Sequence, residues 1–259
     1  MDPLSLDGRV ALITGAASGI GLAVARALGA HGCRIGLLDL DEHTVRTATE
    51  SLKGVEVEQL VADVTDPGHM ESAVEQLAKR FGRIDIVHAN AGINGVWARI
   101  EDITPEEFDQ TIATNLKGSF LTIKYAVPFL KREGGAILLT SSVNGTRVFS
   151  NSGATPYSCS KAGQVAMAKM LAVELGPFGI RVNVICPGYV PSNIHKGTIW
   201  KSDKSIRIPV HYPQGPTPLT SESTPEQVGD LALFLVSDMA KHITGEVVYI
   251  DAGTSLVVG

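Results

Sequence analysis

Short apolar runs alternate with longer amphipathic stretches along almost the whole chain. A run that is apolar nearly throughout is typical of a strand in a parallel sheet, because both faces of such a sheet are buried. One further run, Val55–Asp63, is more polar and suits an outer strand. The nearly continuous apolar runs are Val10–Thr14, Arg34–Asp39, Ile84–Ala89, Ala136–Ser141, Val182–Cys186 and Val247–Ile250.

The stretches between these runs have the spacing of apolar residues that predicts helices. Two helix starts are clearly marked, since Thr104 and Thr224 each place a capping hydroxyl before a first-turn proline. Strands that alternate with helices predict an α/β fold, a doubly wound parallel sheet of about seven strands with helices on both faces. The predicted helices are Ile20–His31, Glu42–Lys53, Pro67–Phe81, Pro105–Leu116, Ser119–Lys131, Tyr157–Phe178 and Pro225–Val236.

No linker, low-complexity tract or short-period repeat divides the sequence, which predicts one domain over residues 1–259. The long stretch without periodicity covers 191–223. Loops of this size are usually functional.

Composition narrows the function classes. The chain of 259 residues has a formal net charge of -5, and this lack of basic excess argues against a nucleic-acid partner. No apolar run approaches membrane-spanning length and no signal peptide is readable, so we expect a cytoplasmic protein without a membrane partner. The cysteines Cys33, Cys159 and Cys186 show no CxxC spacing. We therefore expect packed thiols and no metal site.

A glycine-rich segment, TGAASGIG, joins the first predicted strand to the first predicted helix. Gly15, Gly19 and Gly21 allow a tight turn and a close approach of the backbone to a pyrophosphate. The start of the following helix supplies free N–H groups to the same anion. The spacing GxxxGxG differs from the common GxGxxG fingerprint, but the position between strand and helix predicts a nucleotide site.

Asp39 ends the second predicted strand, 18 residues after Gly21. A carboxylate there accepts hydrogen bonds from both ribose hydroxyls of adenosine and repels a 2′-phosphate. Leu40 follows it and the glycine loop contains no Lys or Arg, so charge favours NAD over NADP. The structural alternative is that Asp39 caps a helix that begins near Asp41.

Tyr157 and Lys161 lie four residues apart in the segment YSCSK. In a helix these positions share a face, and a neighbouring cation lowers the pKa of tyrosine from about 10 toward working pH. The pair alone also fits an ordinary surface contact. The rest of the chain has to distinguish a proton-transfer pair from that alternative.

The ordered set of motifs resembles the short-chain dehydrogenase/reductase family. The resemblance extends from Arg9 to Gly253 and implies a Rossmann-type fold in one domain. It also implies an NAD(H)-dependent oxidoreductase that interconverts a secondary alcohol and its ketone. The motifs, in order, are TGAASGIG, HANAG at His88–Gly92, Asn115, the pair Ser141–Ser142, YSCSK, the pair Pro187–Gly188, and ITGEVVYIDAG.

The resemblance implies a catalytic set of four residues. Tyr157 is expected to be the acid/base, with Lys161 lowering its pKa and holding the nicotinamide ribose. Ser142 is expected to position the substrate oxygen, and Asn115 to anchor a water that relays protons through Lys161. Two alternatives stay open, since Asn115 could simply kink or pack its helix and Ser142 could be a turn residue.

The resemblance also implies the cofactor contacts. Asp63 and Val64 match a pair that contacts adenine, and Val190 matches the backbone that binds the carboxamide. Asn90 could instead be mainly structural, tying strands together through its amide. The expected NAD site is Gly15, Ser18, Gly19, Ile20, Gly21, Asp39, Leu40, Asp63, Val64, Asn90, Ala91, Gly92, Tyr157, Lys161, Pro187, Gly188, Val190 and Ser192.

The chain departs from the family pattern near the active site. From Ser142 to Tyr157 is 15 residues, about two more than the pattern, which leaves Ser141, Ser150 and Ser152 as competitors for the serine role. His88 stands where a small or polar residue is usual, and we expect a buried neutral side chain there.

Substrate specificity is expected to lie in the loop 191–223, interpreted as a lid, and in the segment Ile93–Ile100. Aromatic walls suit cyclic or apolar substrates, and a basic run in the loop is interpreted as solvated, with an anionic substrate as the alternative. The candidate lining residues are Trp97, Trp200, Tyr212, His195 and His211, and the basic run is Lys196, Lys201, Lys204 and Arg207.

Three other functions remain as alternatives. An NADPH-dependent ketoreductase, including one that reduces acyl-carrier thioesters, is disfavoured by Asp39. A related epimerase or dehydratase also uses YxxxK but differs in glycine loop and length. A non-catalytic nucleotide sensor would be expected to lack Tyr157 or Lys161. The resemblance implies a homo-oligomer, a tetramer or a dimer, joined through helices such as the one near Tyr157.

Overall fold

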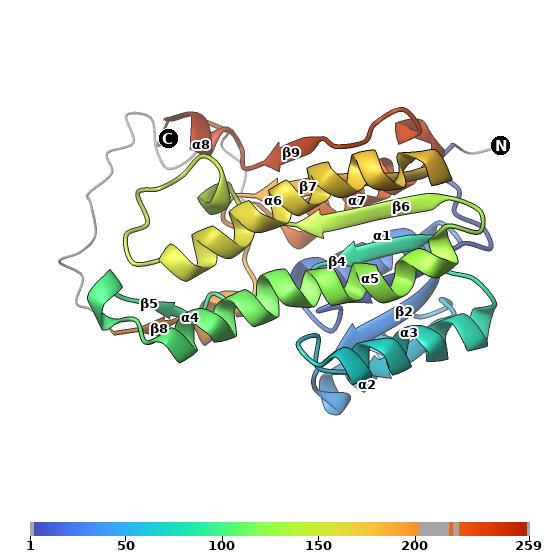
Figure 1. Cartoon of the computed structure of the whole chain (residues 1–259). Helices are drawn as coiled ribbons and strands as arrows, with labels where there is room; N and C mark the ends of the chain where they lie inside the picture. The colour runs from blue at the N-terminus through green and yellow to red at the C-terminus, as the bar shows by residue number, and fades with distance from the viewer. Residues whose placement is uncertain (1–2, 202–217, 220–222, 258–259) are drawn as a thin grey trace.

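The computed structural model describes residues 3–201, 218–219 and 223–257, with the exception of the Asn193 side chain. Seven strands of the described chain form one sheet in the order β3-β2-β1-β4-β6-β7-β9, and every pairing is parallel. The predicted doubly wound α/β fold is confirmed (Figure 1). The strands are β1 (Val10–Thr14), β2 (Arg34–Asp39), β3 (Val57–Val61), β4 (Ile86–Ala89), β6 (Gly135–Thr140), β7 (Ile180–Pro187) and β9 (Val247–Ile250).

Helices cover both faces of the sheet. Buried apolar residues of α3, α5 and α6 form one core with the strands, and those of α1, α2 and α7 form another on the opposite face. Figure 1 shows the first group in front of the sheet and α1 and α7 behind it. The helices are α1 (Gly19–Ala30), α2 (Glu42–Ser51), α3 (Pro67–Phe81), α4 (Pro105–Ile112), α5 (Gly118–Leu130), α6 (Thr155–Leu175), α7 (Pro225–Val236) and α8 (Thr254–Val257).

The predicted helix starts at Thr104 and Thr224 are confirmed. Each threonine side chain accepts a hydrogen bond from the backbone N–H three residues on, at Glu107 and Gln227. The side chains of these two residues bond back to the backbone of the threonine, which completes a capping box in α4 and in α7.

The helices predicted over Pro105–Leu116 and Ser119–Lys131 are not separate. A π-helical turn, Ala113–Lys117, joins α4 to α5, and the two form one long rod in Figure 1. The expected break is absent because Asn115, in the middle of the turn, is buried and bonded by its side chain. Such a turn is frequent at functional sites.

A small second sheet was not predicted. It pairs β5 (Val96–Trp97) with β8 (Ile199–Trp200) in parallel, and each strand has only two residues. Two residues cannot show a period, so the pattern of the sequence carries no signal for it. The pairing places the start of the 191–223 segment beside the segment that follows β4.

None of the helices in the described residues is long and apolar enough to cross a membrane.

Candidate active site

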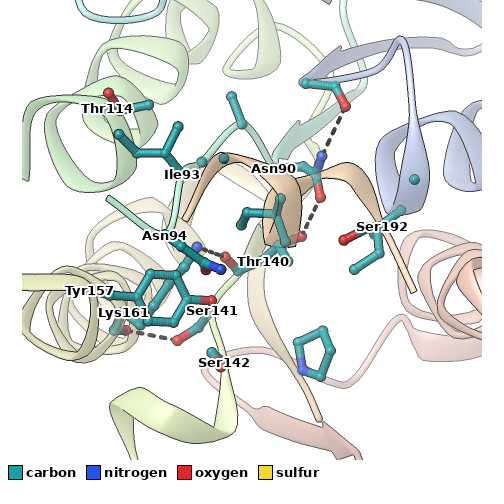
Figure 2. Close-up of a pocket in the computed structure, with 18 of the residues that line it drawn as sticks. Asn90, Ile93, Asn94, Thr114, Thr140, Ser141, Ser142, Tyr157, Lys161 and Ser192 are labelled. Atoms are coloured by element: carbon teal, nitrogen blue, oxygen red, sulfur yellow. Dashed lines mark hydrogen bonds between the residues drawn. The ribbon is translucent and has the colours of Figure 1, made fainter. Parts of the chain in front are cut away.

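A cavity of about 1080 Å³ opens at the carboxyl ends of the parallel strands. Residues that follow β1 and β4 both line it, at the point where the strand order reverses and α/β sheets bind ligands. Every residue of the predicted catalytic and cofactor set lines this cavity except Gly21 and Asn115. Figure 2 shows Tyr157, Lys161 and Ser142 close together at one part of its wall.

The glycine loop leaves room for an anion at the start of α1. Gly15 and Gly19 adopt positive φ of 63° and 53°, and a Cβ on Gly15 would lie 2.9 Å from the Ala91 Cα. Gly21 does not line the cavity but packs beneath the loop, where a Cβ would lie 2.8 Å from the Asn90 Nδ2. The Ser18 side chain makes no capping bond, so first-turn N–H groups stay available.

Asp39 points its carboxylate at the glycine loop. Its Oδ2 accepts a hydrogen bond from the Ala17 N–H at 3.0 Å, and its Oδ1 accepts one from the Leu40 N–H at 2.8 Å. The alternative that Asp39 caps the next helix is wrong, because the cap of α2 is Asp41, which accepts from the Thr44 N–H. One bond on each oxygen leaves lone pairs free for ribose hydroxyls.

Asn90 ties three strands together at the rim of the cavity. Its Nδ2 donates to the carbonyls of Thr14 and Gly15, and its Oδ1 accepts from the Thr140 hydroxyl at 3.0 Å. These bonds favour the structural interpretation of Asn90. Because Asn90 also lines the cavity, its predicted contact with the cofactor stays a prediction.

Asn115 holds the segment after β4 against the long helix. Its Oδ1 accepts from the Ile93 N–H at 2.8 Å, and its Nδ2 donates to the Ile93 carbonyl and the Ser160 hydroxyl. Its backbone carbonyl accepts from Ser119 and from Gln164. These bonds favour the structural interpretation, and the water-anchoring role stays a prediction.

Among the candidate serines, Ser142 is the one whose side chain acts on Tyr157. Its side chain lowers the pKa of Tyr157, and its hydroxyl accepts a hydrogen bond from the Asn144 N–H, which begins a short turn. Ser141 instead donates to the Lys161 backbone carbonyl at 2.8 Å and ties β6 to α6. Ser150 lines the cavity, whereas the Ser152 hydroxyl is buried without a partner in the described chain.

Tyr157 and Lys161 lie on one face of α6, with the Lys161 Nζ 5.6 Å from the centre of the phenol ring. The Nζ donates to the Thr140 backbone carbonyl at 2.8 Å. Burial raises the pKa of Tyr157, and the Ser142 side chain opposes that rise. Burial lowers the pKa of Lys161 to about 8, and the expected lowering of the Tyr157 pKa by Lys161 stays a prediction.

His88 is buried and neutral, as predicted. Burial lowers its pKa to about 3, and its Nε2 lies 2.8 Å from the Thr140 hydroxyl oxygen. The Thr140 proton goes to Asn90, so His88 must donate through Nε2. Its Nδ1 is left without a partner in the described residues.

This buried histidine is expected to make the protein less stable in acid. Below its unfolded pKa of about 6.5 the unfolded chain binds a proton that the folded chain refuses, so stability falls by about 1.4 kcal/mol per pH unit down to about 3. We expect His88→Gln to flatten the pH dependence of the free energy of unfolding between about pH 4 and 6, measured by urea denaturation. The exposed histidine His43→Gln should keep the wild-type slope, and an equal slope in both variants would disprove the assignment.

Two of the predicted packed thiols are buried, and the third is not. Burial raises the pKa of Cys33 to about 12 and raises that of Cys186, so both are unreactive thiols. The packing role expected for Cys159 is wrong, because its side chain is exposed on the outer face of α6. No group of three or more metal-binding side chains occurs within the part of the chain described here.

The expected substrate walls are present in part. Trp97 and His195 line the cavity, and Trp200 packs on Trp97 with ring centres 4.9 Å apart. In the basic run, Lys196 is exposed and Lys201 forms an ion pair with Glu107 at 2.6 Å. The candidates Lys204, Arg207, His211 and Tyr212 lie outside the described residues.

Several lining residues were missed by the sequence reasoning. Asn94, Asn144, Asn151 and Tyr189 all face the cavity. A signal existed for three of them, since Asn94 follows the NAG segment closely, Asn144 lies two residues past Ser142 and Tyr189 follows Pro187–Gly188. Asn151 had none, because it lies within the longer Ser142–Tyr157 connection.

Comparison with known proteins agrees with this geometry. Residues 15–255 match the family model described as enoyl-(acyl carrier protein) reductase. Oxidoreductase UcpA of Escherichia coli O157:H7 is 37% identical over 254 residues, which are 97% of this chain and 96% of UcpA. The chain belongs to the short-chain dehydrogenase/reductase family.

Solved structures of family members are also similar. A 3-ketoacyl-ACP reductase from Sinorhizobium meliloti 1021 is 47% identical, with a TM-score of 0.90 over 95% of this chain and 99% of that one. A 3-ketoacyl-(acyl-carrier-protein) reductase from Brucella melitensis complexed with NADH is 28% identical, with a TM-score of 0.86 over 97% of this chain and all of that one (100%). The chain is thus an oxidoreductase with a nucleotide-binding Rossmann fold, and a nicotinamide cofactor is expected.

Proposed function

We propose that the protein interconverts a secondary alcohol and its ketone with NAD(H), with Tyr157 as general acid/base. The observation that carries the proposal is that Tyr157, Ser142 and Lys161 line the same cavity, with the Lys161 Nζ 5.6 Å from the centre of the phenol ring and the Ser142 side chain lowering the pKa of Tyr157. A proton donor next to a second hydroxyl is the arrangement that a carbonyl oxygen needs when it becomes an alcohol.

The chain's own residues supply the proton and the orientation. A nicotinamide cofactor, when bound, supplies hydride transfer to or from carbon. In ketone reduction the Tyr157 hydroxyl gives its proton to the substrate oxygen, and in alcohol oxidation the phenolate takes that proton back. Ser142 bonds the oxygen in either redox state, since a hydroxyl both donates and accepts.

Lys161 is proposed to stabilise the phenolate and to hold the nicotinamide ribose. Its Nζ is fixed by the Thr140 carbonyl, and Thr140 is in turn bonded to His88 and Asn90. This support keeps the ammonium within reach of the phenol ring, and no carboxylate of the described residues forms an ion pair with it. With a pKa of about 8, Lys161 is mostly charged at pH 7.

The glycine loop and Asp39 support NAD as the cofactor. The first-turn N–H groups of α1 suit a pyrophosphate, and the carboxylate of Asp39 suits unmodified ribose hydroxyls. The second candidate is an NADPH-dependent ketoreductase for acyl-carrier thioesters, which the name of the Sinorhizobium meliloti relative favours. Initial rates with NADH and NADPH on a ketone and on an acyl thioester distinguish the two.

A spectrophotometric screen tests the proposed function. The wild-type chain and NAD⁺ are mixed with sugars, polyols, cyclic alcohols, steroids and hydroxyacids, and NADH formation is followed by absorbance. Turnover of at least one secondary alcohol is expected. Tight NADH binding with no turnover of any alcohol or ketone would favour the nucleotide-sensing alternative instead.

A homo-oligomer is proposed through the outer faces of α5 and α6. Met170 and Val173 on α6 are exposed by 72% and 79%, and Phe120 on α5 is exposed by 49%. Large apolar side chains gathered on a surface usually mark an interface. We expect sedimentation equilibrium to give the mass of two or four chains, and Met170→Glu with Val173→Glu to reduce it. A wild-type mass near 27.4 kDa would refute the proposal.

A further inference from the structure

We propose that the cavity beside Tyr157 binds a neutral, polyhydroxylated ring, such as a pyranose or a cyclitol. This inference rests on the proposed function and names its substrate class. The side chains that recognise the ring are the amides of Asn94, Asn144 and Asn151, with Trp97 and Tyr189 as aromatic walls. All five line the cavity.

The charges of the wall argue against an anionic substrate. The described residues that line the cavity include a single basic Lys or Arg side chain, that of Lys161. Its Nζ donates a hydrogen bond to the Thr140 carbonyl. Lys201 is paired with Glu107 outside the lining. A carboxylate or phosphate is normally met by Arg or Lys, so the described wall lacks the partner that such a group needs.

The amides leave both donors and acceptors facing the cavity. Asn151 donates through Nδ2 to the Asn144 Oδ1 at 3.0 Å, so the Asn144 Nδ2 and the Asn151 Oδ1 have no partner in the described chain. Reversing both amides exchanges these roles and still leaves one donor and one acceptor. Hydroxyl groups satisfy such a pair because each of them donates and accepts.

Asn94 adds a third fixed amide next to the tyrosine. It is 6% exposed, its Nδ2 donates to the Thr198 hydroxyl at 2.7 Å, and its backbone carbonyl accepts from the Trp97 indole N–H. Its Oδ1 has no partner among the described residues. Asn94 lines the same cavity as Tyr157 and Lys161, and Figure 2 labels all three in its wall.

The wall is built from segments that the fold holds in place. The Ile199 and Lys201 N–H groups donate to the carbonyls of Gly95 and Trp97, which fixes β8 beside β5. The longer Ser142–Tyr157 connection brings Ser150 and Asn151 into the lining and is tied to the same region by the Ala98 N–H, which donates to the Gly153 carbonyl. The extra length thus supplies polar groups to the substrate end.

Aromatic side chains complete the match to a ring. The Trp97 and Tyr189 rings line the cavity, and Tyr189 stacks on His195 with ring centres 4.9 Å apart. Such rings offer apolar area to the C–H groups of a saturated ring, while the amides meet its hydroxyls. This division between apolar walls and a few placed polar groups is usual in small-molecule sites.

The test compares rings that carry several hydroxyls with a ring that carries one. The kcat/KM with NAD⁺ is measured for myo-inositol, D-galactose and D-arabinose, and for cyclohexanol as the ring with one hydroxyl. We expect at least one of the polyhydroxylated rings to exceed cyclohexanol by tenfold or more. Equal or better turnover of cyclohexanol would overturn the inference and leave the proposed function standing, whereas no turnover of any alcohol or ketone would remove both.

Asn151→Leu gives a second, internal readout. We expect this variant to lower the ratio of kcat/KM for the preferred polyhydroxylated ring over cyclohexanol by about tenfold, the effect of one lost hydrogen bond to substrate. Phe149→Ala is the matched control, since Phe149 is in the same loop, is 69% exposed and does not line the cavity. A ratio unchanged in Asn151→Leu would contradict the inference. Asn151 is exposed, so the substitution should not prevent folding.

Discussion

Replacing Tyr157 by Phe is expected to reduce kcat by about a thousandfold while NADH binding is retained. The phenol is 8% exposed, and phenylalanine fills the same space without the hydroxyl. What is lost is the hydroxyl proposed to exchange a proton with the substrate oxygen, and general acid–base catalysis of this kind contributes about 10²- to 10⁴-fold. The loss of turnover is measured by spectrophotometry, and the retained NADH affinity is measured by fluorescence titration.

The control for this variant is a second tyrosine. Tyr125→Phe removes a hydroxyl from α5, outside the cavity lining, and should leave turnover unchanged. Both variants should keep the thermal unfolding temperature within a few degrees of the wild type. Substantial alcohol oxidation by Tyr157→Phe would mean that another group moves the proton.

The pH profile adds a readout of the proton transfer itself. Because burial raises the pKa of Tyr157, the group is a phenol at neutral pH, which is the acid that ketone reduction needs. Alcohol oxidation needs the phenolate, so its kcat/KM should rise by about tenfold per pH unit below that pKa. Ketone reduction should not rise with pH over the same range.

The sheet and the nucleotide site were predictable because their signals are local. The apolar runs that became β1, β2 and β9 have the predicted bounds, since each lies between clear turn residues. The glycine loop and Asp39 follow from one strand–turn–helix unit and the strand after it. Parallel strands then bring their carboxyl ends to one edge, which collects the distant motifs without further information.

The features of the fold and the site that the sequence did not predict depend on contacts between residues far apart in the chain. The continuous rod through Asn115 requires the Ile93 peptide, and the support of Lys161 requires Thr140 and His88 from two other strands. The spacing of apolar residues contains no information about such long-range pairs. The same holds for β5 and β8, whose pairing joins positions about a hundred residues apart.

The tuning of the proton-transfer pair was also beyond the sequence. The spacing of Tyr157 and Lys161 indicated a shared helix face, and the structure confirms it. The spacing did not reveal that both groups are buried, and burial moves each pKa toward the neutral form. Charge separation in the pair therefore depends on the surroundings that α6 and β6 build.

Replacing Asp39 by Ala is expected to lower kcat/KM with NAD⁺ by at least tenfold and to narrow the preference over NADP⁺. The carboxylate is held toward the glycine loop by the Ala17 and Leu40 N–H groups, where it suits two ribose hydroxyls and repels a 2′-phosphate. Asp41→Ala is the matched control, because it removes a carboxylate two residues away that caps α2. That control should lose some stability and keep the wild-type ratio of kcat/KM for NAD⁺ over NADP⁺.

Since no Lys or Arg occurs from Gly15 to Gly21 or at position 40, Asp39→Ala should relax the preference for NAD⁺ without reversing it. An unchanged ratio of kcat/KM for NAD⁺ over NADP⁺ would show that Asp39 does not contact the ribose.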